Sequence, residues 1–501
     1  CRGVRADRLV RSAFARFPIR WMSTIAGKPL PNVIIAAMPM ILLTGLVGIV
    51  YRPIWIVAML ALGTLIAFRS PSIMLALLAV SVPVQAAFVV DIAGSPFTIT
   101  KLVIVCLAIG WLPRIARAHI PLDRVTWGYA SILVALVASV VAVQEELRWA
   151  SIVYQWAVAV FVYIVARTEV RTIRTAQVIV GSMALAVVGI SMVAFRQVLA
   201  EDGPPSFVVN GVLRAYGTFG EPNPLAAYLE LSIPLLLAIV ALNAVSRHRA
   251  PLCPGMTLLL VAATISGTVA LLLTQSRGGG LGFMAACMVI VAMMPVRWRL
   301  GLLGLAAVAV CGFLLTPPGA GFLASMADGF GSLRGRGEVT PANWANEERR
   351  AHWEAAIRMF LDRPLSGIGA GEFNQEYRQY TPEWRFRVGR GHAHNGYLHL
   401  AAESGLPGLL AFVAWCTLVS GALIGRIRRP RTDLELMLAV GAGATFVAFM
   451  VHSMVDYLNV LSLGIQIALV IALGMACFST ERVASRGRGQ TVRKQIAAHL
   501  S

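Results

Sequence analysis

The stretch Arg390-Gly-His-Ala-His-Asn-Gly-Tyr-Leu-His-Leu-Ala-Ala-Glu-Ser-Gly-Leu-Pro-Gly408 joins the longest polar interval of the chain to a long apolar segment. Its first half is rich in histidine, and the residues that follow it are almost all apolar. An apolar run of about 20 residues is long enough to cross a bilayer as a helix. The stretch therefore predicts a point where the chain passes from water into a membrane, with ionisable side chains gathered at the boundary.

Apolar residues dominate the whole chain. Of its 501 residues, 57% are hydrophobic and only 13% are charged, which is more apolar than a soluble domain. Runs long enough to span a bilayer recur from Asn32 to Thr480. We therefore predict an all-α polytopic membrane protein. The cysteines, apart from Cys1, lie in or beside apolar runs and form no CxxC pair, which favours small core residues over a disulfide framework or metal site.

The apolar runs divide into twelve to fourteen predicted spans. The division into fourteen places them near 33–50, 53–68, 71–90, 100–114, 125–143, 150–166, 175–199, 223–245, 255–275, 279–296, 300–316, 395–424, 434–454 and 458–478. The predicted organisation is a basic tail over 1–30, eleven spans within 31–316, a large loop over 317–393, three spans within 394–480 and a basic tail over 481–501.

Basic residues concentrate in alternate loops between the predicted spans. Lys and Arg mark the cytoplasmic loops of membrane proteins, so we expect both termini in the cytoplasm and the loop 317–393 on the opposite side. This placement explains most of the net charge of +19 without a nucleic-acid partner. A basic surface that binds anionic membrane lipids is compatible with the same orientation.

The loop 317–393 is too long for a simple connector. Thr340-Pro341 has the form of a helix N-cap with proline in the first turn, and apolar residues then recur at helical spacing until Asp362-Arg363-Pro364. Gly367-Ile-Gly-Ala-Gly371 follows no predicted strand. We interpret it as a tight turn where backbone approaches a helix closely, not as a dinucleotide-binding loop.

Three arginines occur where the positive-inside rule does not favour them. Arg214 and Arg277 lie in glycine-rich outer turns, and Arg349 lies on the predicted loop helix. A guanidinium is always charged and matches phosphate oxygens with a planar fork. Each alone also fits an interfacial anchor or a helix cap. Together they predict that the protein binds an anionic lipid headgroup.

Glu221 and Asn223 follow Arg214 in the same outer loop. Asn223 with Pro224 fits an N-cap and the first position of a helix. Glu221 fits either a contact to a sugar hydroxyl or a cap, and the residues do not choose between these.

His392, His394, His399 and Glu403 fall within twelve positions. His399 and Glu403 would share one helix face, so a metal site made by these four residues is one interpretation. No HExxH or tetrahedral ligand pattern is present, and we predict that no metal is bound. A neutral histidine can instead act as a general base, and Arg390 would favour the neutral form if it lies close. Chemistry alone does not choose between His392 and His394.

Four motifs occur in order: Arg-x-x-Gly-Thr-Phe-Gly-Glu-Pro-Asn (214–223), Thr-Gln-Ser-Arg-Gly-Gly (274–279), Arg-x-x-x-Trp with Pro-Leu-x-Gly-x-Gly (349–369), and His-Ala-His-Asn-x-x-Leu…Glu-x-Gly-x-x-Gly (392–408). With His452-Ser-Met-Val-Asp-Tyr457, this pattern resembles the O-antigen ligase and polymerase superfamily over about half the chain. The resemblance implies a GT-C-type bundle and an inverting glycosyltransferase that needs no metal and no other cofactor. The donor it implies is a glycan on undecaprenyl pyrophosphate, at the periplasmic face of a bacterial inner membrane.

The resemblance also assigns roles to residues. His394, which precedes Asn395, would be the catalytic base. Arg214 and Arg349 would hold the pyrophosphate, and Arg277 either contacts it or supports the fold. From their positions in the sequence, and not from the resemblance, we expect His392 to orient His394. We expect Glu403 either to shape the start of the helix or to support His394 from behind.

The acceptor is left open by the sequence. A ligase would transfer the glycan to lipid A core, and a polymerase would transfer it to a second lipid-linked glycan at the same site. The resemblance favours about twelve spans, so additional N-terminal spans leave the subfamily undecided. A third reading, a flippase or transporter of lipid-linked oligosaccharides, predicts ionisable residues near the bilayer midplane and repeated halves. The sequence shows charges at the outer edge and no repeat.

Overall fold

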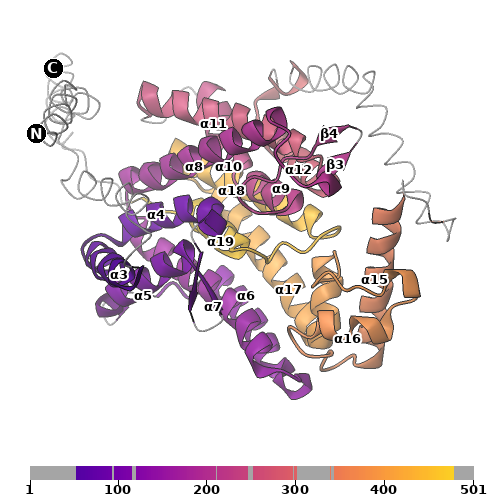
Figure 1. The fold of residues 1–501 in the computed structure, drawn as a ribbon. Coiled ribbons are helices and arrows are strands. Elements are labelled where there is room, and N and C mark those ends of the chain that lie inside the picture. The colour runs from indigo at the N-terminus through magenta and orange to yellow at the C-terminus, as the bar shows by residue number, and fades with distance from the viewer. Residues whose placement is uncertain are drawn as a thin grey trace, which may run out of the picture.

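The computed structural model describes residues 52–87, 89–92, 95–115, 120–209, 211–245, 252–296, 298–301, 339 and 343–478. Most of this part of the chain is helical, and its strands form two short antiparallel hairpins (Figure 1). Seven of the described helices are long and apolar enough to cross a membrane. The predicted class, an all-α polytopic membrane protein, is therefore confirmed. The number of spans stays a prediction.

The N-terminal part of the bundle contains six helices, two short 3₁₀ turns and one hairpin. They are α3 (Arg52–Arg69), α4 (Pro71–Val84), η2 (Gln85–Ala87), β1 (Val89–Ile92), β2 (Ser95–Thr98), α5 (Ile99–Ile115), α6 (Arg124–Ala138), η3 (Ser139–Ala142), α7 (Glu146–Glu169) and α8 (Ile173–Leu199). The span predicted over 71–90 ends early, because the chain leaves α4 at Val84 and turns back through the hairpin. The predicted spans at 33–50 and, apart from its first two residues, 300–316 lie outside the described residues.

The middle of the chain adds the elements that carry the predicted arginines. They are η4 (Pro205–Phe207), β3 (Val208–Val209), β4 (Val212–Leu213), α9 (Pro222–Glu230), α10 (Ile233–Val245), α11 (Pro254–Leu273) and α12 (Arg277–Met293). The span predicted over 223–245 is broken between α9 and α10. Pro234 lies in the first turn of α10, where its missing N–H and fixed φ are tolerated, and the break places Glu230 at the end of a helix inside the bundle.

Three C-terminal helices complete the bundle: α17 (Gly396–Arg428), α18 (Asp433–His452) and α19 (Leu463–Gly474). α18 packs against α12 and α10, and α17 packs along α6. An aromatic cluster joins these helices, with the Trp415 ring 5.2 Å from Tyr129 and 5.8 Å from Trp156. Such ring pairs add about 0.5–1.5 kcal/mol each beyond area burial. The aromatic cluster therefore fixes α17 against α6 and α7.

The loop before α17 contains α15 (Trp344–Asp362), α16 (Phe373–Tyr380) and η5 (Trp384–Phe386), which lie together at one end of α17 (Figure 1). α15 ends at Asp362, as predicted, while Thr340 and Pro341 lie outside the described residues. Ala355, Met359 and Phe373 are fully buried in a small core of this loop. The described part of the loop, from 343 onward, is thus a packed unit.

The glycine turn before α16 fastens this loop to α17, as the sequence predicted. α17 is interrupted at Gly405, whose φ is 63°. Leu406 N donates to the carbonyl of Pro364 at 2.7 Å, and Ile368 N donates to a carbonyl of α17 at 2.9 Å. Gly367 has φ +65°, and a Cβ there would lie 2.3 Å from the backbone of α17. Glycine is required because the two backbones touch.

Candidate active site

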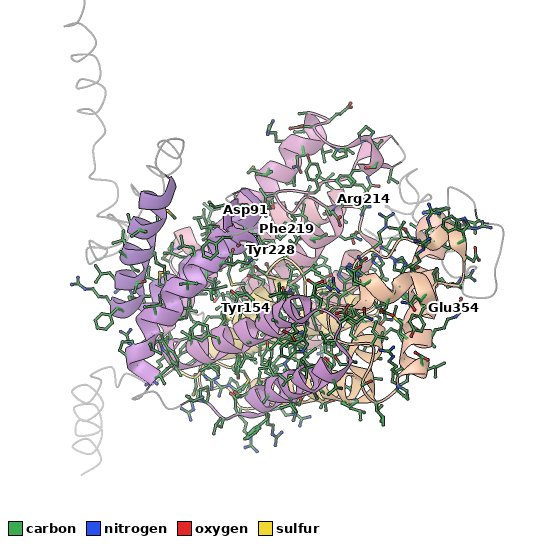
Figure 2. All side chains as sticks on the ribbon, turned by 60° about the horizontal axis from the view of Figure 1, so that its bottom comes forward. Asp91, Tyr154, Arg214, Phe219, Tyr228 and Glu354 are labelled. Atoms are coloured by element: carbon green, nitrogen blue, oxygen red, sulfur yellow. The ribbon has the colours of Figure 1, made fainter. Side chains whose placement is uncertain are left out.

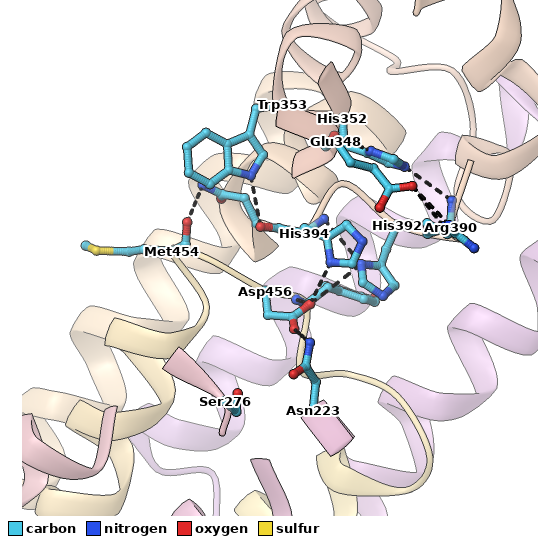
Figure 3. Close-up of polar contacts among 12 residues, drawn as sticks. Asn223, Ser276, Glu348, His352, Trp353, Arg390, His392, His394, Met454 and Asp456 are labelled. Atoms are coloured by element: carbon cyan, nitrogen blue, oxygen red, sulfur yellow. Dashed lines mark hydrogen bonds and ion pairs between the residues drawn. The ribbon is translucent and has the colours of Figure 1, made fainter. Parts of the chain in front are cut away.

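Three loops meet where the loop helices face the bundle. They are the segment 390–395 before α17, the turn 453–457 after α18, and the segment 214–223 before α9. Figure 2 shows Arg214 on the side of the bundle that faces the loop helices, and Figure 3 shows the polar contacts that join these segments. The predicted site residues therefore come from segments far apart in sequence.

The centre of this meeting point is a contact between His394 and Asp456. His394 Nδ1 lies 3.1 Å from Asp456 Oδ1, and the two side chains are 16% and 8% exposed. The same carboxylate oxygen accepts from Tyr457 N at 2.9 Å. Burial raises the pKa of Asp456, but the hydrogen bond from His394 and the nearby imidazoles of His394 and His392 lower it more, to well below its usual range. An ionised Asp456 accepts from Nδ1–H and leaves Nε2 of His394 as the basic nitrogen.

Asn223 links this pair to the first predicted arginine. Its Nδ2 donates to Asp456 Oδ2 at 3.2 Å, and its Oδ1 accepts from Arg214 at 3.0 Å. The predicted N-cap role of Asn223 is wrong, because α9 begins two residues earlier than predicted, with Glu221 at the cap position and Pro222 first in the helix. Asn223 therefore points into the site, where it connects Arg214 to Asp456.

Arg277 and Arg349 lie close to Arg214. The Nε of Arg214 donates to the carbonyl of Thr274 at 2.8 Å, and Arg277 donates to Asn346 Oδ1 on α15 at 2.6 Å, one turn before Arg349. Burial, then repulsion by Arg349 and Arg277, lower the pKa of Arg214 to about 10. The side chain of Arg349 makes no hydrogen bond or ion pair with any described residue. A guanidinium matches phosphate oxygens with a planar fork, so three such groups near one another can bind an anion.

The backbone of His394 is held in a strained conformation. Its φ is +49°, in the left-handed region, which costs an ordinary L-residue about 1–2 kcal/mol. Trp353 Nε1 donates to the His394 carbonyl at 2.9 Å, and Asn395 caps α17 by accepting from the N–H groups of Tyr397 and Leu398. Asn395 Nδ2 also donates to the carbonyl of Met454 at 2.8 Å. These contacts fix where the imidazole points, and such strain concentrates at functional sites.

The imidazoles of His352 and His392 lie beside His394. His392 Nδ1 accepts from His394 N at 3.2 Å, and the ring centres of His352 and His394 are 5.3 Å apart. Burial lowers the pKa of His352 to about 4, and burial followed by the neighbouring His394 lowers that of His392 to about 4. His352 Nδ1 faces the Glu348 carbonyl at 2.7 Å, and its Nε2 accepts from Arg390 N at 3.3 Å. Both neighbours are therefore neutral near pH 7.

The remaining predicted residues lie around this centre and not in it. Arg390 pairs with Glu348 at 3.1 Å and braces the loop helix. Glu221 is exposed, and its side chain does not cap α9. Glu403 is buried in α17, where it accepts from Phe373 N at 3.1 Å and lies 3.5 Å from His399. Glu403 therefore supports the loop contact on α17.

A different set of residues from the one considered in the sequence could hold a metal. Ligand atoms of His392, His394 and Asp456 lie within 4.8 Å of one another. Two imidazoles and a carboxylate are ligands that suit a divalent transition ion. Against this, the three arginines raise the local positive potential, and the His394 and Asp456 atoms are already hydrogen-bonded to each other. Activity measured with a chelator distinguishes a metal site from a metal-free His394–Asp456 pair, because only the metal site loses activity.

Residues 259–413 match the family model described as O-antigen ligase. This segment is similar to the O-antigen ligase family. The match confirms the family resemblance and covers less than a third of the chain; three of the four motifs lie within it, and the first, 214–223, lies before it. The matched segment contains Arg277, Arg349 and His394. The structure adds Arg214, Asn223 and Asp456 to it from segments on either side. No curated protein matches the chain.

Sequence reasoning missed His352 and gave no separate role to Asp456. His352 carried no motif signal, because it lies inside the Arg-x-x-x-Trp pattern as one of the unspecified positions. Asp456 was part of the last motif, His452-Ser-Met-Val-Asp-Tyr457, and its position after a predicted span placed it on the same side as His394. The buried Glu230 was also missed, since an isolated acidic residue in an apolar run gives no hint of its partner.

Proposed function

We propose that this membrane protein is an inverting, metal-independent glycosyltransferase of the GT-C type. It would move a glycan from undecaprenyl pyrophosphate to an acceptor hydroxyl at the periplasmic face of a bacterial inner membrane. The family match supports ligase- or polymerase-type glycosyl transfer in O-antigen assembly. The observation that carries the finer proposal is the short path from Arg214 through Asn223 and Asp456 to His394, which joins an anion site to a base.

In this mechanism His394 Nε2 removes the proton of the acceptor hydroxyl. Asp456 holds Nδ1–H and stabilises the imidazolium as it forms. A positioned general base contributes about 10²–10⁴-fold to the rate. The oxygen then attacks the anomeric carbon, the bond to the pyrophosphate oxygen breaks, and the configuration inverts. The proton ends on His394 and the electron pair on the leaving group.

Arg349, Arg277 and Arg214 would stabilise the pyrophosphate as negative charge develops on it. The Arg349 side chain has no polar partner in the described part of the chain, which supports a role for its guanidinium in binding the pyrophosphate. Arg277 begins α12, and a helix N-terminus also favours an anion. Fixed cations of this kind supply the charge stabilisation that a metal ion gives in other transferases.

The test is transfer by the purified protein from an undecaprenyl-pyrophosphate glycan in the presence of EDTA. Lipid A core and a second carrier-linked glycan are offered side by side as acceptors. Product on lipid A core identifies a ligase, which we favour, and product on the second carrier identifies a polymerase. Movement of intact carrier-linked glycan across a vesicle membrane without transfer would indicate the flippase class and overturn the proposal.

A further inference from the structure

A second acid–base pair lies buried below the site. His452 Nδ1 is 2.8 Å from Glu230 Oε1, and the side chains are 1% and 0% exposed. Glu230 ends α9 at the break before α10, and His452 is the last residue of α18. Neither residue contacts His394 or the arginines through any hydrogen bond in the described part of the chain. The mechanism proposed above does not use this pair.

α12 is shaped to accommodate the pair. A Cβ at Gly278 would lie 2.5 Å from Nε2 and Cδ2 of the His452 ring, and a Cβ at Gly282 would lie 2.6 Å from Glu230 Oε2. A Cβ at Gly280, between them in the same glycine run, would meet nothing within 4 Å. Two glycines therefore allow the hydrogen-bonded pair to lie directly against the helix that begins with Arg277.

The backbone of His452 begins the turn that carries Asp456. Its carbonyl accepts from Asp456 N and Val455 N, both at 2.9 Å. The carbonyls of the next two residues, Ser453 and Met454, accept from Gly396 N and from the Asn395 side chain, at 2.7 and 2.8 Å. The start of α17 is thus bonded to the turn 453–457, and the turn begins at His452.

A buried acid–imidazole pair is a poor source of stability, because removing such polar groups from water costs about as much as their attraction returns. Apolar residues of similar size would fill the same space. Unlike apolar packing, a hydrogen bond is directional. The bond between Glu230 and His452 therefore fixes the rotation of the imidazole and of the helix end that bears it. This difference points to placement of the turn, and not to packing, as the role of the pair.

We propose that Glu230 and His452 are a positioning pair for transfer. Glu230 holds His452 against the first turn of α12, and this contact sets the turn that aims Asp456 at His394, at a fixed place relative to Arg277. The inference rests on the proposed transferase function. It makes Glu230 and His452 residues that act through Asp456, without contact to substrate.

The experiment compares Glu230→Leu, Glu230→Gln, Gly278→Ala and Gly280→Ala in transfer and in donor binding. Glu230→Leu is expected to lower kcat at least tenfold while donor Kd changes less than threefold, because none of the arginines that the structure describes bonds to Glu230. Glu230→Gln keeps an oxygen that accepts from His452 Nδ1–H, so kcat is expected to stay within threefold of wild type. Gly278→Ala should repeat the loss of kcat, and Gly280→Ala, its matched control, should not.

Reaction of His394 with diethyl pyrocarbonate, read by peptide mass spectrometry, gives a measurement independent of transfer. Glu230→Leu and Gly278→Ala should both increase the rate of modification at His394. Each of three results would overturn the positioning role. The first is an equal loss of kcat in Glu230→Gln and Glu230→Leu, the second is an equal loss in the two glycine variants, and the third is an unchanged rate of His394 modification. If wild type transfers nothing, the proposed function fails, and His394 reactivity still decides the role of the pair. If Glu230→Leu does not fold, the glycine variants decide it.

Discussion

Asp456→Asn isolates the contribution of one charge at the centre of the site. Oδ1 of Asp456 accepts from His394 Nδ1 and from Tyr457 N, and Oδ2 accepts from Asn223 Nδ2. All three partners are donors, and an amide offers only one acceptor oxygen. If that oxygen faces His394, the new NH₂ group faces the NH₂ group of Asn223. If Asn223 then flips, its NH₂ group faces Arg214 and that hydrogen bond is lost.

At least one hydrogen bond to a charged partner is therefore lost whichever way the amide turns. Such a bond is worth about 1.5–3 kcal/mol, which corresponds to a fall in kcat of about 10- to 150-fold. The assay is single-turnover transfer with saturating donor. Glu354→Gln is the control, because Glu354 pairs with Arg358 at the surface of α15, away from the network. A kcat for Asp456→Asn within twofold of wild type, in folded protein, would refute the assignment of Asp456 as the partner of His394.

Three other predictions concern the anion site, the buried imidazoles and the loop contact. Arg349→Ala should raise donor Kd about tenfold or more with little change in thermal stability, as expected for a charged group whose partner is the ligand, whereas Arg358→Ala should change neither. The thermal unfolding midpoint should fall as the pH falls from about 6.5 toward 4. The reason is that His352 is neutral in the folded protein, with a pKa of about 4, and takes up a proton when the chain unfolds. His352→Phe should flatten this pH dependence, and an unchanged slope would count against a buried neutral His352. Gly367→Ala should lower the unfolding midpoint sharply, since its Cβ would lie 2.3 Å from the backbone of α17, while Gly421→Ala, which meets nothing within 4 Å, should not.

The fold class followed from the sequence because apolar run length is a direct physical requirement of the bilayer. The end of α15 at Asp362 and the glycine turn at 367 were also predictable, since proline and glycine restrict backbone conformation locally. The break between α9 and α10 was not, although Pro234 signals it. A proline in an apolar run is equally compatible with a kink or with the first turn of a new helix.

The site was predictable in its residue types and not in its connections. Histidine, arginine and their motifs indicated His394 and the three arginines, and the structure brings these together. The N-cap assigned to Asn223 failed because a two-residue shift in the start of α9 turns a cap into a site residue. Partners such as Asp456 and Glu230 depend on how helices distant in sequence pack. No local pattern reports that packing.

The central claim is that His394 is a base that works beside an arginine-lined anion site without a metal. The most direct measurement is the rate of transfer by purified wild type and His394→Ala, with undecaprenyl-pyrophosphate glycan, acceptor and EDTA. We predict that wild type keeps its full rate in EDTA and that His394→Ala falls by about 10²–10⁴-fold, as expected for loss of a general base. A wild-type rate from His394→Ala, or loss of wild-type transfer in EDTA that added Zn²⁺ restores, would contradict it.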